Sequence, residues 1–320
     1  QLALHIVDES DREDRFTFAE MKRRSYQVAA WLNEQGVRRG DKVLLMLGNV
    51  APLWEIMLAC VRLRAVMIPT STLLTADELR DRVARGDVRH AVVESAHTPR
   101  FDDVPGDYQR IAVGAPVDGW VSYAGSYRSP ETFEPDGPTE KDTPLLYYFT
   151  SGTTAKAKLV THTHQSYPIG HLSTMFWLGL KPGDIHLNIS SPGWAKHAWS
   201  NFFAPWNAGA TVFVLTYQRF EASDALEIIA EHGVTTLCAP PTVWRLLIQE
   251  NLAKYPVELR ELVGVLSRAR QYAEYDPLRD YAFRVEEGPS LDAPERAALE
   301  GQEDDDTAPP GDVDEGGLDL

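Results

Sequence analysis

A segment rich in hydroxyl groups and lysines, between residues 147 and 158, has the composition of a phosphate-binding turn. Residues 145–149 predict a buried strand, and a polar turn follows it. Hydroxyls and backbone amides donate hydrogen bonds and lysine adds a mobile positive charge, so together they suit the oxygens of a polyphosphate. The residues that offer these groups are Thr150, Ser151, Gly152, Thr153, Thr154 and Lys158. An ordinary polar turn is the alternative interpretation.

Two other kinds of site are disfavoured in this region. A Walker loop needs a second glycine and a Lys-Ser or Lys-Thr pair, and neither follows Gly152 in the required pattern. His162, His164 and His171 come after the turn, but no HExxH pattern or suitably spaced carboxylate accompanies them. We expect these histidines to form a polar cluster and assign no metal ligand.

The elements that would position the turn alternate between helix and strand. The expected strands lie at 42–47, 65–68, 90–93, 145–149, 185–189, 211–215 and 234–238. The expected helices lie at 17–35, 52–63, 75–85, 166–178, 198–207, 222–231 and 241–251. Thr17 and Glu20 form a capping box, and Pro52 suits a first helical turn. Strands separated by helices indicate βαβ units, so the predicted fold class is α/β with parallel sheets in two lobes.

Changes in composition divide the chain into four parts. Residues 1–114 predict a first α/β lobe, and residues 144–264 predict a second lobe that contains the phosphate-binding turn. Between them, residues 115–143 hold four prolines and three glycines, which indicates a linker or a long loop. Residues 265–320 diverge from the pattern. Because they are acidic and poor in apolar residues, we expect a largely disordered tail.

Charge and cysteine content exclude several classes of protein. The net charge is −16, and residues 285–320 contribute −12 of it, so the chain lacks the basic surface that nucleic-acid binding requires. Two distant cysteines, Cys60 and Cys238, exclude a disulfide framework. No apolar run reaches eighteen residues, and the first residues do not resemble a signal peptide. We therefore expect a cytoplasmic protein without a membrane span or a nucleic-acid partner.

The hydroxyl-rich turn resembles the phosphate-binding signature of the adenylate-forming (AMP-binding) superfamily, which includes acyl-CoA synthetases, luciferases and peptide-synthetase adenylation domains. That signature reads roughly T-S-G-T-T-G-x-P-K. The chain matches it at residues 150–154 and at Lys158, and differs at Ala155 and Ala157. Other segments that resemble acyl-CoA synthetases lie at 16–20, 36–43, 68–69, 190–194 and 239–242. The resemblance extends from residue 1 to about residue 264.

This resemblance implies the N-terminal domain of an adenylate-forming enzyme, in incomplete form, and an ATP-dependent acyl-CoA synthetase reaction. ATP and a carboxylic acid would form an acyl-adenylate and pyrophosphate, with Mg²⁺ neutralising charge, and coenzyme A would then take the acyl group. Residues 150–154 and Lys158 would hold the β- and γ-phosphates. Trp194 and His197 would lie beside the acid and its acyl pocket, with a place for Trp194 in the core as the alternative.

Later superfamily motifs have no counterpart after Val263. The last lysine is Lys254, so neither the superfamily's catalytic lysine nor its metal-binding glutamate is identified, and no catalytic residue is assigned. We expect a truncated chain that is weak or inactive alone. A shifted reading frame after about Gly264 would explain the change of pattern, and resequencing the locus tests it. Ala155 and Ala157 should also loosen the turn.

Two alternatives stay open besides the acyl-CoA synthetase. The chain could be a non-catalytic remnant or binding module of the same fold, or it could belong to another adenylating enzyme, such as a peptide-synthetase adenylation domain. Carboxylate-dependent exchange of pyrophosphate into ATP would distinguish the two kinds of adenylating enzyme from the non-catalytic binding module. Apolar surface that the missing parts would normally cover predicts self-association.

Overall fold

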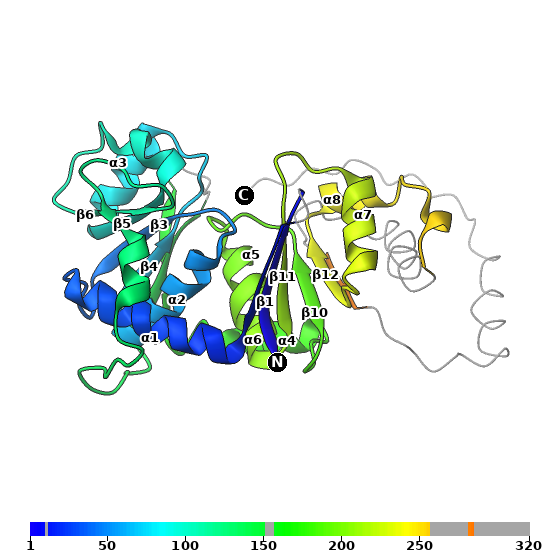
Figure 1. Cartoon of the computed structure of the whole chain (residues 1–320), viewed down its shortest axis with the longest axis horizontal. Helices are drawn as coiled ribbons and strands as arrows, with labels where there is room; N and C mark the ends of the chain where they lie inside the picture. Colours follow the sequence, from blue (N-terminus) through cyan, green and yellow to red (C-terminus); the bar gives the residue numbers. More distant parts are fainter. Residues whose placement is uncertain (10–11, 151–156, 257–280, 285–320) are drawn as a thin grey trace, which may run out of the picture. The chain divides into compact units, whose positions relative to one another are not determined.

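Two β-sheets, each flanked by helices, form the framework of the chain (Figure 1). The structure is a computed structural model that describes residues 1–9, 12–150 and 157–256, together with the backbone of 281–284. These residues belong to one unit, Gln1–Val285. The second unit, Glu286–Leu320, and with it most of the predicted acidic tail, lies outside the described residues.

The first sheet, sheet A, has parallel strands in its centre and antiparallel strands at its edges. Its order within the described chain is β13-β12-β10-β11-β1-β2. The strands are β1 (Leu2–Asp8), β2 (Glu13–Thr17), β10 (Ile185–Asn188), β11 (Thr211–Thr216), β12 (Thr236–Ala239) and β13 (Tyr281–Arg284). β1, β11, β10 and β12 run parallel, while β2 and β13 pair antiparallel to their neighbours. β13 falls within the stretch that the sequence predicts to be largely disordered.

The second sheet, sheet B, carries the strand that leads into the hydroxyl-rich turn. Its order within the described chain is β7-β6-β5-β3-β4-β8-β9. The strands are β3 (Lys42–Met46), β4 (Val66–Pro69), β5 (Val88–Glu94), β6 (Gln109–Val113), β7 (Val121–Ser122), β8 (Pro144–Thr150) and β9 (Lys158–Thr163). All neighbours are parallel except β8 and β9, which form an antiparallel hairpin around the turn. Parallel strands linked through helices confirm the predicted α/β fold class.

Helices cover both sheets, and the longest of them, such as α1 and α2, bury an apolar face. The helices are α1 (Phe18–Glu34), α2 (Ala51–Leu63), α3 (Ala76–Arg85), α4 (Gly170–Trp177), α5 (Ala195–Ala198), α6 (Ala204–Ala208), α7 (Ala222–Glu231) and α8 (Pro241–Leu247). Shorter turns are η1 (Ser95–Phe101), η2 (Tyr123–Arg128), η3 (Trp199–Phe203) and η4 (Leu252–Lys254). The largest core joins α1 and α2 to strands of both sheets, through residues such as Leu4, Leu45, Met57 and Val212. α7 and α8 pack on sheet A, and α3 packs on sheet B.

Strands from the first expected lobe, residues 1–114, pair with strands from the second, residues 144–264. β1 and β2 come from the first expected lobe but belong to sheet A, where β1 pairs with β11 and β2 pairs with β1. β8 belongs to the second expected lobe but pairs with β4 of sheet B. Each exchange buries an apolar strand inside a parallel sheet, where it gains two hydrogen-bonded neighbours. The four-part division itself stays a prediction.

Local sequence signals fix several helix ends as predicted. The Thr17 hydroxyl accepts from the Glu20 amide at 3.2 Å, and the Glu20 carboxylate accepts from the Thr17 amide at 2.7 Å. The same reciprocal capping begins α3 at Thr75. The helix expected at 198–207 is instead divided into α5, the π-type turn η3 and α6. Pro205 has no amide hydrogen to give to the Asn201 carbonyl, which accepts from Trp54 Nε1 at 2.8 Å.

The segment 115–143 is largely irregular, yet several contacts hold it to the helices. Tyr123 is buried beside Trp31 of α1, with ring centroids 5.8 Å apart. Arg64, at the end of α2, forms an ion pair with Asp136 and donates to the carbonyls of residues 137 and 138. Its backbone is left-handed, with φ of 56°, and its side chain is buried. Arg64 thus occupies a backbone conformation that suits glycine, and residues 136–138 of the irregular segment pair with its buried charge.

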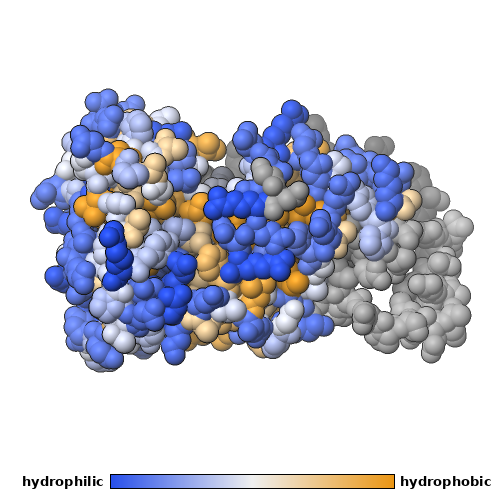
Figure 2. Space-filling model, in the orientation of Figure 1, coloured by the Kyte–Doolittle hydropathy of each residue, from blue (hydrophilic) through white to orange (hydrophobic). Residues whose placement is uncertain are grey.

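Apolar side chains are exposed mainly on one short helix. Ile169, Leu172, Phe176 and Trp177, on α4 and just before it, are between 39% and 77% exposed. The face in Figure 2 is mostly hydrophilic, with hydrophobic residues gathered near its middle. No helix in the described residues is long and apolar enough to cross a membrane.

Candidate functional site

A cavity of about 410 Å³ lies where two parallel strands of sheet B end, and we call it the hydroxyl cavity. It is lined by Pro69, Thr70, Ser71, Leu73, Leu74, Arg82, Tyr148, Phe149, Thr150, Gly193, Trp194, Ala195 and Lys196. β4 and β8 are neighbours in the sheet, and their carboxyl ends supply one wall. Ligands of α/β proteins bind at the carboxyl ends of parallel strands, which makes this a candidate site.

The lining of the hydroxyl cavity is suited to an anion with an apolar portion. Among the described lining residues the charged ones are Arg82 and Lys196, and none is a carboxylate. Four hydroxyl-bearing residues add hydrogen-bonding groups, namely Thr70, Ser71, Tyr148 and Thr150. Leucine, proline and aromatic side chains provide the apolar part of the wall. Positive charge and hydroxyl donors favour phosphate or carboxylate oxygens, and apolar walls favour a hydrocarbon group.

The β8–β9 hairpin brings the two ends of the hydroxyl-rich turn together. Thr150 and Lys158 are register partners across the hairpin, and Arg85 donates to the Ala157 carbonyl at 2.8 Å. Of the predicted phosphate-binding residues, Thr150 lines the cavity and Lys158 is exposed at the start of β9. Ser151, Gly152, Thr153 and Thr154 lie outside the described residues.

Arg82 is a site residue that sequence reasoning missed. It lies on α3, a helix rich in charged residues, yet its side chain is only 13% exposed. Its guanidinium lies 4.3 Å from the Phe149 ring centroid and 3.0 Å from Asp81. Helical periodicity could not reveal this burial, because it depends on β8 packing beside α3.

Trp194 reaches the hydroxyl cavity from the segment that precedes α5. Its side chain is 65% exposed, so it is a surface residue, unlike Trp54, Trp31 and Trp244, which are buried. The neighbouring Gly193 allows this approach, because a Cβ atom there would overlap the backbone of Ser71. The structure thus brings Thr150 and Trp194, far apart in sequence, onto one cavity.

His197 is close to Trp194 in sequence but is not in the lining of the hydroxyl cavity. The ring is buried, with Nε2 2.8 Å from Asn49 Oδ1 and 3.2 Å from Asn201 Nδ2. Burial lowers the pKa of His197 to about 3, so the imidazole is neutral at pH 7. Its ring lies 5.7 Å from that of Trp54. These contacts give His197 a packing position between α2 and the α5–η3 segment.

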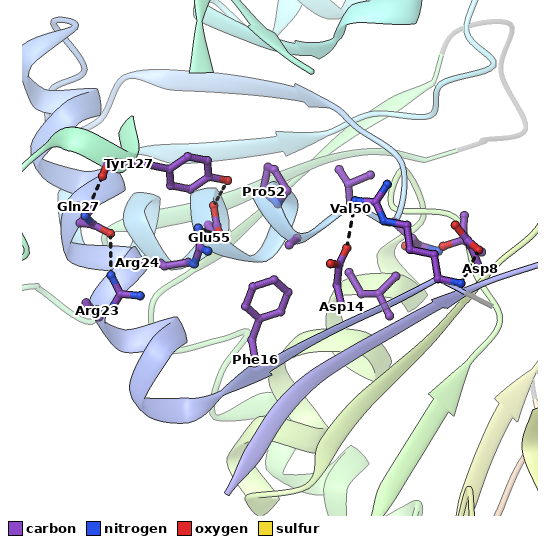
Figure 3. Close-up of a pocket in the computed structure, with 15 residues that line it drawn as sticks. Asp8, Asp14, Phe16, Arg23, Arg24, Gln27, Val50, Pro52, Glu55 and Tyr127 are labelled. Atoms are coloured by element: carbon purple, nitrogen blue, oxygen red, sulfur yellow. Dashed lines mark hydrogen bonds and ion pairs between the residues drawn. The ribbon is translucent and has the colours of Figure 1, made fainter. Parts of the chain in front are cut away.

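A larger cavity of about 510 Å³, the arginine cavity, lies between α1, α2 and the β1–β2 hairpin (Figure 3). It is lined by Ile6, Asp8, Arg12, Asp14, Phe16, Arg23, Arg24, Gln27, Asn49, Val50, Ala51, Pro52, Glu55, Tyr127 and Thr216. Three arginines face three carboxylates. Glu55 is fully buried and pairs with Arg24 at 3.2 Å, while the Tyr127 hydroxyl donates to it at 3.1 Å. Burial raises the pKa of Glu55.

The three histidines after the turn do not form a metal-ligand group among the described residues. His162 and His171 instead contact Tyr167, with ring centroids 4.5 and 4.3 Å apart. Burial lowers the pKa of His171 to about 4 and also lowers the pKa of His162. The rings therefore act as packing groups around a buried tyrosine.

Sequence comparison identifies related proteins over most of the chain. A profile described as "AMP-binding enzyme" matches residues 3–278. Acyl-coenzyme A synthetase ACSM3, mitochondrial, of Mus musculus is 31% identical over 256 residues, which are 78% of this chain and 44% of that protein. 4-Hydroxybutyrate–CoA ligase 1 of Metallosphaera sedula is 33% identical over 257 residues, covering 79% and 45%. The chain spans less than half the length of these relatives.

Solved structures share the fold at lower identity. An anthranilate CoA ligase, AuaEII, in complex with anthranoyl-AMP, matches with a TM-score of 0.72 and 22% identity, over 81% of this chain and 50% of that one. An acyl-CoA synthetase of Brucella canis matches with a TM-score of 0.71 and 22% identity, over 78% and 46%.

Proposed function

Because the chain belongs to the AMP-binding enzyme family, we propose that it carries the ATP- and acid-binding part of an ATP-dependent acyl-CoA synthetase. One observation supports this most: the hydroxyl cavity joins Thr150, at the start of the signature turn, to Trp194 and two cationic side chains, and no carboxylate is among its described lining residues. The relatives are named as acyl-coenzyme A synthetases and CoA ligases.

The proposed roles follow the chemistry of each wall. Thr150 and the rest of the turn, Ser151–Thr154 with Lys158, hold the β- and γ-phosphates of ATP. Lys196 and Arg82 offset the negative charge of the phosphates and of the acid. Trp194 and the leucines cover the hydrocarbon part of the acid. His197, neutral and buried, positions the segment that carries Trp194 and Lys196 and does not transfer a proton.

In the proposed reaction an oxygen of the acid attacks the α-phosphorus of ATP in line, and pyrophosphate leaves. The sulfur of coenzyme A then attacks the acyl carbonyl, its proton is lost, and AMP leaves as the acyl-thioester forms. The chain's part is to align the first two reactants and to balance their charge. The described lining residues offer no carboxylate to Mg²⁺, so the ion fits them only as a partner of the phosphates, and no step is assigned to it.

The substrate we propose is a carboxylic acid with an apolar chain or ring, such as a fatty acid. A cavity of about 410 Å³ with leucine, phenylalanine and tryptophan in its wall supports this class over a strongly polar acid. An aromatic acid is the closest variant of this proposal.

Exchange of labelled pyrophosphate into ATP, measured over a panel of short, medium and aromatic acids, tests the function. We expect slow exchange that requires an acid and falls with Thr150→Val, while the exposed control Thr132→Val behaves as the wild type. Acyl-CoA formation on adding coenzyme A separates an acyl-CoA synthetase from a peptide-synthetase type of enzyme. ATP binding without exchange supports the non-catalytic binding module, and absence of ATP binding overturns both.

We also propose self-association through α4 and a cytoplasmic location. The exposed Phe176 and Trp177 support the first, and light scattering that finds a monomer would contradict it. Cys60 and Cys238 are buried and are not joined to each other in a disulfide, which is compatible with a reducing compartment. Because several mammalian relatives are named as mitochondrial, cell fractionation of the protein is the test.

A further inference from the structure

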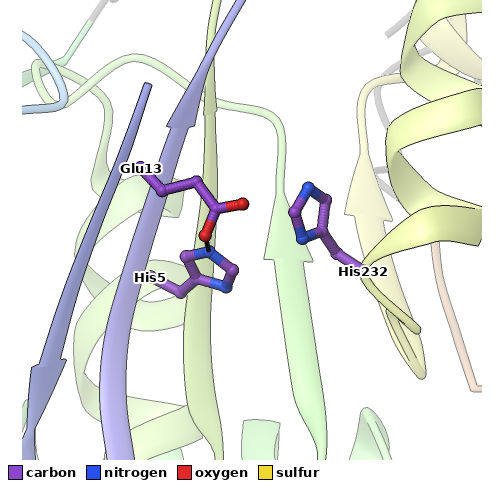
Figure 4. A group of neighbouring side chains, drawn as sticks. All are labelled: His5, Glu13 and His232. Atoms are coloured by element: carbon purple, nitrogen blue, oxygen red, sulfur yellow. Dashed lines mark hydrogen bonds and ion pairs between the residues drawn. The ribbon is translucent and has the colours of Figure 1, made fainter. Parts of the chain in front are cut away.

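Three side chains with metal-binding atoms converge beside the outer edge of sheet A (Figure 4). They are His5 on β1, Glu13 on β2 and His232, which caps the end of α7. Their ligand atoms all lie within 4.8 Å of one another, and they form a group of this kind within the described chain. None of the three lines the hydroxyl cavity or the arginine cavity.

The fold explains why these residues meet. In the β1–β2 hairpin, His5 lies opposite Arg15 and Val7 lies opposite Glu13, so all four side chains share one face of the sheet. Val7 belongs to the core under α7, which places that helix on the same face. Phe213 of β11 packs beneath both imidazoles, with ring centroids 5.0 Å from His5 and 5.2 Å from His232.

The positively charged side chain of Arg15 already contacts two of these residues, His5 and Glu13. His5 Nε2 lies 3.1 Å from the Glu13 carboxylate, and Arg15 Nε donates to the same nitrogen at 3.3 Å. The Arg15 Nη2 atom is 2.6 Å from Glu13. The arginine side chain is 58% exposed, so it can leave without disturbing the core.

We propose that His5, Glu13 and His232 form a binding site for a divalent transition-metal ion of the zinc type, in competition with Arg15. Two imidazoles and one carboxylate are a ligand set that zinc and similar ions accept, with a water in the fourth position. A tetrahedral ion with ligands at about 2.0–2.1 Å holds them roughly 3.3 Å apart. The ligands must therefore close in, which the half-buried His232 and the exposed Glu13 allow. The bound ion would join the β1–β2 hairpin to α7.

Zinc titration of the metal-free 320-residue chain against a chromophoric chelator tests the site. We expect one ion per chain, a rise in Tm of several degrees on binding, and a cobalt spectrum typical of nitrogen and oxygen ligands. His5→Gln and His232→Gln should each weaken binding at least tenfold. His97→Gln, a histidine outside the group, serves as the matched control and should bind as the wild type.

Arg15→Gln keeps all three ligands and removes the competing cation, so it should bind zinc several times more tightly than the wild type. Circular dichroism of each metal-free variant checks its folding. If the His5 and His232 variants fold and bind zinc like the wild type, or if Arg15→Gln lowers the affinity, the site does not exist as proposed. Binding of several ions per chain with equal affinity in all variants would equally overturn it.

Discussion

The arginine cavity and the hydroxyl cavity differ in how their charges are satisfied. The arginine cavity is larger, about 510 Å³ against 410 Å³, but its three arginines face three carboxylates within the same wall. The hydroxyl cavity has two cationic side chains and no carboxylate among the lining residues that the structure describes. A phosphate or carboxylate entering the first cavity would have to displace Glu55 or Asp14 from its lining. In the second cavity the carboxylate that pairs with Arg82, Asp81, lies outside the described lining.

This difference teaches that charge balance, and not volume, separates a ligand site from a polar structural network. In the arginine cavity, Glu55 joins Arg24 of α1 to Tyr123 and Tyr127 of η2, and so connects three elements. Asn49 of the same cavity bonds His197, the residue after Lys196 of the hydroxyl cavity. The uncharged hydrogen-bonded pair Asn49 and His197 thus links the two cavities.

The largest expected effect is on stability, from the arginine cavity. Glu55→Ala leaves the partly buried Arg24 without its carboxylate and should lower the free energy of unfolding by about 3 kcal/mol. Urea unfolding measures this, with the exposed Glu131→Ala as control, which should cost less than about 0.5 kcal/mol. ATP affinity of the folded Glu55→Ala protein should be unchanged. A parallel loss of ATP affinity would contradict the division between the two cavities.

The link through His197 should appear as a pH dependence of stability. The pKa of His197 is lowered to about 3 in the folded protein, so protonation favours the unfolded chain. The stabilisation that the neutral His197 gives to the folded protein is fully present above the ordinary pKa of 6.5 and is lost as the pH falls toward 3. Between pH 6.5 and pH 5 the loss should approach about 2 kcal/mol. Urea unfolding of His197→Gln should show a correspondingly shallower dependence, and an identical dependence would refute the neutral, buried assignment.

Removing one cation from the hydroxyl cavity should weaken nucleotide binding. Lys196→Met keeps an apolar chain of similar length and should lower ATP affinity about tenfold, or roughly 1.4 kcal/mol. Lys181→Met, an exposed lysine away from the lining, is the matched control for calorimetric titration. Equal affinity of the two variants would mean that the charge in this wall does not serve an anion.

The smallest effect on stability is expected for the exposed tryptophan. Trp194→Ala should change the free energy of unfolding by less than about 0.5 kcal/mol, because the side chain is mostly in solvent. It should nevertheless weaken binding of an apolar acid about fivefold, by loss of ring contact. Trp177→Ala, exposed to a similar degree on α4, should leave acid binding unchanged. If both variants bind the acid equally, Trp194 is only a surface residue.

Local signals in the sequence predicted most of the frame. The Thr17–Glu20 capping box and the alternation of apolar strands with helices depend on neighbouring residues, and both are confirmed. The pairing of β1 with β11 joins residues about 200 positions apart, and no local pattern specifies it. Pro205 was only partly informative. Its missing amide hydrogen predicts an interruption of the helix, but not that Trp54 would donate to the Asn201 carbonyl in its place.

Less of the site was predictable, because burial and convergence decide it. Thr150 and Trp194 could be named from the sequence, and the structure brings them to one cavity. Arg82 was not identified as a site residue from the sequence, and its burial depends on Phe149 of another element. Nothing in the sequence around His197 distinguishes a ligand-facing imidazole from the buried one observed.

Calorimetric titration of ATP into the 320-residue chain, in parallel with Thr150→Val and the control Thr132→Val, tests the central claim most directly. The hydroxyl cavity as an anion site predicts one ATP per chain for the wild type and the control, with at least fivefold weaker binding for Thr150→Val. No binding by the wild type, or the same affinity in all three proteins, would contradict it.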